Sequence, residues 1–139
     1  MFLSIFSMIL SLPSMFSSTA ELSVTIHGME EYKGVVRIGL YEGADNFLVE
    51  SSLRFFADVS VTNSEVTHVF ADLPAGEYAV SVYHDANDNH KLDKNFMGIP
   101  SEGYGFGNDA RGMFGPPDYE DVMIRLIEGE SRKMRVRVK

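Results

Sequence analysis

Along most of this chain, hydrophobic and polar residues alternate one by one. In residues 21–27, for example, Leu22, Val24 and Ile26 are separated by polar positions. This period of two is typical of a β-strand with one buried face. The pattern predicts seven strands, at residues 21–27, 35–41, 53–61, 67–71, 77–83, 121–127 and 133–139.

Turn-forming residues lie between these segments, and no stretch has a convincing helical period. Pro74 and Gly76, for example, define a tight turn before the fifth strand. Seven short strands separated by turns predict an all-β fold, a seven-stranded antiparallel β-sandwich. With 139 residues and 45% hydrophobic content, the chain is long enough for one domain around a single core.

Three local features refine this picture. Gly39, inside the second strand, predicts a bulge or the close approach of another backbone. Phe47 and Leu48, in the loop after that strand, are expected to plug one end of the core. The last strand carries a strongly basic face, which favours a solvated edge strand whose charge protects it from aggregation.

The first twenty residues differ from the rest. Residues 2–16 are almost wholly apolar or serine, and Ser18, Thr19 and Ala20 are small residues suited to signal peptidase. We expect a signal peptide at residues 1–20, a domain at residues 21–139, and export to the periplasm or medium. No basic residue precedes the apolar run, so a hydrophobic first strand or a membrane anchor is the alternative. The run is too short and serine-rich to predict a stable membrane span.

Charge and cysteine content exclude several classes of function. The formal net charge of −8 argues against a nucleic-acid or anionic-membrane partner, since either would require a basic patch. The absence of cysteine excludes disulfides, thiolate metal sites and a cysteine nucleophile. It leaves the cellular compartment open.

The long loop predicted at residues 84–120 contains the most distinctive chemistry. Four oxygen-bearing side chains occupy relative positions 1, 3, 5 and 9, and a backbone carbonyl occupies position 7: Asp85, Asn87, Asn89, Asp93 and the carbonyl of Lys91. This is the spacing of an EF-hand-type calcium loop, in which alternate residues face the ion. Oxygen ligands without His or Cys favour Ca²⁺ over transition metals.

Two positions depart from the calcium pattern. His90 stands at position 6, where the pattern has glycine, and Phe96 stands at position 12 in place of a bidentate glutamate. A carboxylate from elsewhere, such as Glu102 or Asp88, would have to complete the ligand shell. The alternative is that these Asp and Asn side chains form Asx-turns and cap backbone amides without metal.

The second half of the loop combines glycine and proline with aromatic rings. The aromatic residues are Phe96, Tyr104, Phe106, Phe114 and Tyr119. We expect them to be buried as a satellite core, because a loop of this length needs apolar anchors. The alternative is an exposed platform that binds a small ligand, a sugar or peptide.

Catalysis is the least supported interpretation. His84 beside Asp85 could form a general base, and Glu102 with Asp109 could form a carboxylate pair. The sequence has no nucleophile elbow, H-E-x-x-H, Walker or Rossmann motif. We therefore expect a protein that is not an enzyme.

Two blocks of sequence resemble a bacterial family of small exported proteins, the domain of unknown function DUF2141. They are LPAGEYAVSVYHDANDNHKLDKNFMGIPSEGYGFGN at residues 73–108 and FGPPDYED at residues 114–121. The resemblance implies an export signal and a sandwich similar to immunoglobulin-like or prealbumin-like domains, and it implies no known activity. We therefore expect a binding or structural module of the cell envelope, with an unidentified envelope partner or small ligand.

Overall fold

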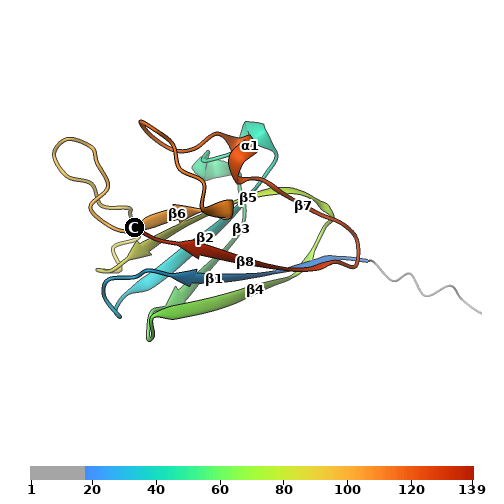
Figure 1. Cartoon of the computed structure of the whole chain (residues 1–139), viewed down its shortest axis with the longest axis horizontal. Coiled ribbons are helices and arrows are strands. Elements are labelled where there is room, and N and C mark those ends of the chain that lie inside the picture. Colours follow the sequence, from blue (N-terminus) through green and yellow to red (C-terminus); the bar gives the residue numbers. More distant parts are fainter. Residues whose placement is uncertain (1–17) are drawn as a thin grey trace, which may run out of the picture.

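The computed structural model of the protein describes residues 18–139, which form two β-sheets packed face to face (Figure 1). The strands are β1 (Ala20–His27), β2 (Val35–Glu42), β3 (Leu53–Ser60), β4 (Glu65–Leu73), β5 (Gly76–Asp85), β6 (Tyr104–Phe106), β7 (Ile124–Leu126) and β8 (Ser131–Arg137). The helical elements are η1 (Ala44–Asn46), η2 (Glu50–Ser52), η3 (Gly107–Asp109) and α1 (Tyr119–Val122). The predicted all-β sandwich is confirmed.

The smaller sheet has the strand order β4-β1-β8, and the larger has the order β3-β2-β5-β6, with β7 also paired to β5. Strand β5 lies at the centre of the larger sheet. Strands β6 and β7 share one edge of β5, because β6 pairs with Ser81–Tyr83 and β7 with Gly76–Tyr78. The Asp- and Asn-rich loop that follows Asp85 therefore begins at the end of β5, a strand that is paired on both sides.

One strand pair departs from the predicted antiparallel arrangement. Strand β8 runs parallel to β1, with Val24 opposite Met134. After β7 the chain crosses from the larger sheet to the smaller one, where the Gly129 NH donates to the Thr19 carbonyl (3.2 Å). A turn at residues 128–130 can join two neighbouring antiparallel strands, but here it joins strands in different sheets. Within residues 18–139 the sandwich has eight strands, one more than predicted, and one of its strand pairs is parallel.

Two short elements lie where the sequence predicted something else. The predicted strand at residues 121–127 is divided into α1 and β7. Glu120 and Asp121 lie in the first turn of α1, where negative charge stabilises a helix, and the Met123 NH closes the turn on the Tyr119 carbonyl (2.9 Å). Strand β6 lies inside the predicted loop, so the irregular part of the loop is shorter than the sequence predicted.

The alternating apolar residues form the main core between the sheets, with fully buried side chains such as Leu22, Ile38, Tyr78 and Val136. A second cluster contains Tyr41, Ala79, Phe106 and Val122, with several half-buried rings packed against it. Phe47 joins this second cluster as predicted, whereas Leu48 is more than a third exposed and does not plug the core.

The prediction of a bulge or an approaching backbone at Gly39 is wrong, because the nearest group is the end of a flexible side chain. A Cβ atom at Gly39 would lie 2.7 Å from Leu53 Cδ1. The neighbouring bulge between β2 and β3 lies one residue later, between Leu40 and Tyr41. The predicted edge position of β8 is confirmed, and its arginines at 135 and 137 are exposed.

The predicted signal peptide at residues 1–20 lies almost entirely outside the described residues. Within the described part, Ser18 Oγ donates to Glu128 (2.8 Å), and Ala20 is buried opposite Leu73 at the start of β1. No helix among residues 18–139 has the length and apolar character needed to cross a bilayer.

Candidate functional site

The loop begins at a buried carboxylate at the end of β5. The Asp85 side chain is 0% exposed, and its Oδ2 atom lies 3.0 Å from Arg37 Nε. Its oxygens also accept hydrogen bonds from the backbone NH groups of Asn89 (3.0 Å) and His90 (2.8 Å). The carboxylate of Asp85 thus connects Arg37, in β2 of the larger sheet, to the first turn of the loop.

Arg37 forms hydrogen bonds with several side chains at this end of the larger sheet. Its guanidinium donates to Asp58 (2.6 Å), Asp88 (3.2 Å) and the Nδ1 atom of His90 (2.6 Å), in addition to Asp85. Burial of Asp85 raises the pKa of its carboxyl, but the hydrogen bonds from Arg37 and from two backbone NH groups hold this pKa below its ordinary value. Asp85 is therefore ionised, and the positive charge of Arg37 balances its negative charge.

The middle of the loop brings together three of the predicted ligands. The side-chain amides of Asn87 and Asn89 donate to the two oxygens of Asp93, at 2.7 and 2.8 Å. The amide oxygens of Asn87 and Asn89 accept from the NH groups of Asn89 (3.3 Å) and Lys91 (3.0 Å). These are successive Asx-turns, which curl the chain around Asp93.

Within residues 85–93, two residues adopt the left-handed conformation. The φ angles are 53° at Asp88 and 65° at His90. His90 stands at the sixth position of the predicted calcium loop, where the pattern has glycine because the backbone must turn sharply. The sharp turn is present despite the histidine, and the hydrogen bond from Arg37 supports the imidazole.

Glu102 joins the two ends of the loop. One carboxylate oxygen accepts the Ala86 NH (3.1 Å) and the other accepts the Asp93 NH (3.0 Å). The Ser101 NH donates to the Asp93 carbonyl (2.8 Å), which brings the chain back beside its starting point. The residue predicted from the sequence to complete the ligand shell is thus adjacent to the loop, where it holds backbone NH groups.

Hydrogen bonds therefore link five of the predicted ligands into one network: Asp85, Asn87, Asn89, Asp93 and Glu102. Lys91 contributes a backbone NH. Among residues 18–139, no three His, Cys, Asp or Glu side chains form a group suited to holding a metal. A cation at this site would depend on the amide oxygens of Asn87 and Asn89 as well as on carboxylates.

Sequence reasoning missed the role of Arg37, which lies 48 residues before Asp85. In the sequence, Arg37 appears simply as a charged residue on the polar face of a predicted strand. Its meaning depends on the register between β2 and β5, which sets Val35 opposite Asp85 and Arg37 opposite Tyr83.

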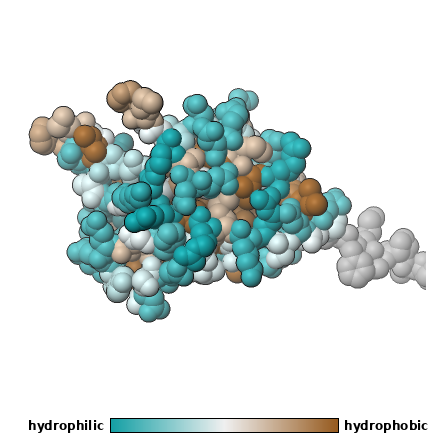
Figure 2. Space-filling model, in the orientation of Figure 1, coloured by the Kyte–Doolittle hydropathy of each residue, from teal (hydrophilic) through white to brown (hydrophobic). Residues whose placement is uncertain are grey.

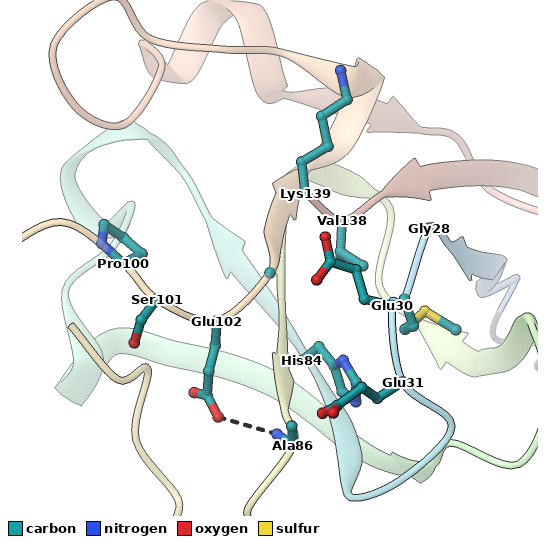
Figure 3. Close-up of a pocket in the computed structure, with 12 residues that line it drawn as sticks. Gly28, Glu30, Glu31, His84, Ala86, Pro100, Ser101, Glu102, Val138 and Lys139 are labelled. Carbon is teal, nitrogen blue, oxygen red and sulfur yellow. Dashed lines mark hydrogen bonds between the residues drawn. The ribbon is translucent and has the colours of Figure 1, made fainter. Parts of the chain in front are cut away.

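The residues considered for catalysis have structural partners. His84 and Glu102 both line a small pocket of about 200 Å³ beside the loop (Figure 3). His84 Nε2 donates to the Lys33 carbonyl (2.7 Å), and both oxygens of Glu102 hold backbone NH groups. Asp109 is not among the residues that line this pocket, and it accepts the Arg137 NH (2.9 Å).

The structure divides the five loop aromatics into two groups. Phe106 is buried in the second cluster, and Tyr104 and Tyr119 are half-buried against it, as expected for a satellite core. The prediction of burial is wrong for Phe96 and Phe114, which are 98% and 97% exposed on two separate loops. The five rings therefore do not form one platform.

Taken together, the fold and the loop define a class of protein, a small β-sandwich with an Asp- and Asn-rich loop at one end. The chain belongs to the DUF2141 family, described as an uncharacterized protein conserved in bacteria, whose model matches residues 24–135. This match confirms the family resemblance found in the sequence. Comparisons with curated proteins and with solved structures gave no significant match.

Proposed function

We propose that the protein is an exported, non-enzymatic binding or structural module of the bacterial cell envelope, with a loop at residues 85–93 that takes up Ca²⁺. The observation that supports Ca²⁺ is the convergence of Asn87 and Asn89 on Asp93 around a left-handed His90. Short oxygen-bearing side chains on a sharply turning loop are the ligand type that Ca²⁺ prefers.

We assign the ligand roles from the spacing of the loop, since the side chains of these residues contact one another and backbone NH groups. Asn87, Asn89 and Asp93 would hold the ion through side-chain oxygens, Lys91 through its carbonyl, and Glu102 would complete the shell. Asp85 is already compensated by Arg37 and two NH groups, so we assign it to the frame that positions the loop. With few carboxylates available, the affinity should be modest, with a Kd on the order of 10⁻⁴ to 10⁻³ M.

Thermal unfolding tests the calcium proposal. The midpoint should rise by a few degrees when about 10 mM Ca²⁺ replaces EDTA, because an ion that binds only the folded state stabilises it. Mg²⁺ should have a smaller effect, since it demands a tighter octahedral shell. Asp93→Asn should abolish the rise, while Asp45→Asn, the same change of charge on an exposed helical turn distant in sequence, should retain it. An absent rise, or an equal rise in Asp93→Asn, would reject the calcium site and leave a self-capped loop.

Export is proposed from the apolar segment at residues 2–16 and the small residues that follow it. Full-length protein produced in a bacterial host should appear in the periplasmic fraction, with an intact mass corresponding to a start near Glu21. A matched chain that lacks residues 2–16 should remain in the cytoplasm. Uncleaved protein found only in the cytoplasm or inner membrane would contradict export by a cleaved signal.

The second candidate function is the binding of a small ligand, and a hollow on the protein surface favours it. The hollow measures about 500 Å³ and lies on the outer face of the larger sheet. The exposed ring of Phe56 and the polar groups of Ser81, Tyr83 and Lys91 are among its lining residues. A sugar or peptide would find stacking and hydrogen-bonding groups together here, which the divided loop aromatics do not provide.

A further inference from the structure

Two loops of the molecule end in large apolar side chains that contact almost nothing. On residues 94–100, Phe96 is 98% exposed and Met97 is 69% exposed. On residues 110–117, Met113 is 88% exposed and Phe114 is 97% exposed. We call these segments the first and second tips. Both project from the upper left of the molecule in Figure 1, and their tan to brown ends stand clear of the largely teal body in Figure 2.

The backbone of the first tip satisfies most of its own polar groups through Asn95. The Asn95 NH donates to the Ile99 carbonyl (2.8 Å), and its carbonyl accepts the Gly98 NH (2.9 Å). Its side-chain oxygen accepts the NH groups of Met97 (2.9 Å) and Ile99 (3.1 Å). The first tip is therefore a hairpin held by its own hydrogen bonds, so these NH groups keep their acceptors when the tip leaves water.

The second tip is a tight turn with a fixed base. A Cβ atom at Gly112 would lie 2.1 Å from a backbone oxygen across the turn, and the prolines at 116–117 carry no NH. At the base, Arg111 donates to the carbonyls of Tyr104 (3.3 Å) and Arg137 (3.1 Å). This anchoring holds Met113 and Phe114 away from the body of the protein.

The charges on the tips differ from those of the whole chain. The chain has a formal net charge of −8, but the first tip contains only Lys94 as a charged residue and the second only Arg111. No carboxylate within either segment would oppose entry into an apolar phase. The tips are the part of this acidic protein that is compatible with a lipid headgroup layer.

The shape of the tips distinguishes between possible occupants. A protein partner or a second copy needs a continuous, complementary face, whereas these side chains stand on two separate convex tips. A fluid bilayer adapts to separate convex tips, and phenylalanine suits its interfacial region. We infer that the first and second tips insert together into the surface of a lipid bilayer and attach the protein peripherally to a membrane.

The chain contains no tryptophan, so single reporters can be introduced on each tip. Phe96→Trp and Phe114→Trp are made separately in the full chain, with Phe56→Trp on the outer face of the larger sheet as the control. On addition of phosphatidylcholine vesicles, emission from both tip reporters should shift to shorter wavelength. Lipids brominated in the acyl chains should quench it. The Phe56→Trp control should not respond, which separates insertion of the tips from any contribution of the N-terminal segment.

A second measurement tests membrane binding without a tryptophan reporter. In vesicle co-sedimentation, the double substitution Phe96→Ser and Phe114→Ser should weaken partitioning by at least about tenfold, because two exposed rings no longer enter the bilayer. Cooperative unfolding of the variant confirms that it is folded. The proposal is overturned if neither tip reporter responds to vesicles. It is also overturned if both shift without lipid as protein concentration rises, which would identify a second copy as the occupant.

Discussion

Replacing Asp85 with alanine is expected to lower the free energy of unfolding by about 3–5 kcal/mol, the range found when one partner of a buried ion pair is removed. Asp85 is 0% exposed, and its loss leaves Arg37 without its innermost counter-ion. The NH groups of Asn89 and His90 lose their acceptor as well. We therefore expect this substitution to damage both the larger sheet and the loop.

Urea denaturation of Asp85→Ala and Asp88→Asn measures this effect against a control. Asp88 pairs with the same arginine, but its side chain is 59% exposed, so loss of its charge should cost no more than about 1 kcal/mol. Asparagine is chosen at 88 because it tolerates the left-handed backbone there. If the two substitutions cost the same, the buried pair is not what holds the loop. If Asp85→Ala does not fold, Arg37→Met provides a second test, and it should also be much more damaging than Asp88→Asn.

The pH dependence of stability provides an independent check of the same carboxylate. The folded-state pKa of Asp85 is lowered, so its contribution to stability is fully present above the unfolded-state pKa, about 3.9, and is lost as the pH falls through the folded value. Wild-type stability should thus decline below about pH 4. The decline should be smaller in Asp85→Ala, provided that this variant folds.

The sequence was informative wherever a property repeats along the chain. Alternation located most of the strands, and the same period of two predicted that Asn87, Asn89 and Asp93 lie together, as their hydrogen bonds show. These inferences required only the local geometry of the backbone.

Features that depend on pairing between distant segments could not be predicted in this way. The role of Arg37 requires the β2–β5 register, and the parallel position of β8 requires knowledge of which sheet receives it. The exposure of Phe96 and Phe114 has a similar cause. A ring contributes to a satellite core only if its loop folds back over the sheets, and these two loops project outwards.

The second large effect is expected at Gly34, where the chain turns into β2 directly against the entry of the loop. Gly34 has a φ angle of 66°, and a Cβ atom there would lie 2.2 Å from the Asp85 carbonyl oxygen and 2.8 Å from the Cα of Ala86. A non-glycine residue in this conformation costs about 1–2 kcal/mol. The overlap with backbone adds about 1–3 kcal/mol, because β5 cannot move without breaking its pairing with β2.

Gly34→Ala should therefore lower the free energy of unfolding by about 2–5 kcal/mol in urea denaturation. Gly129→Ala is the matched control, since Gly129 has a similar φ angle of 74° but nothing within 4 Å of the added Cβ. It should cost only about 1–2 kcal/mol, the strain of the left-handed conformation alone. Equal effects would mean that backbone strain, not the contact with Asp85 and Ala86, makes glycine necessary at 34. A larger effect at Gly34 would instead show that the β1–β2 turn and the start of the candidate loop are packed as one unit, so that the loop is held in place from outside as well as by its own Asx-turns.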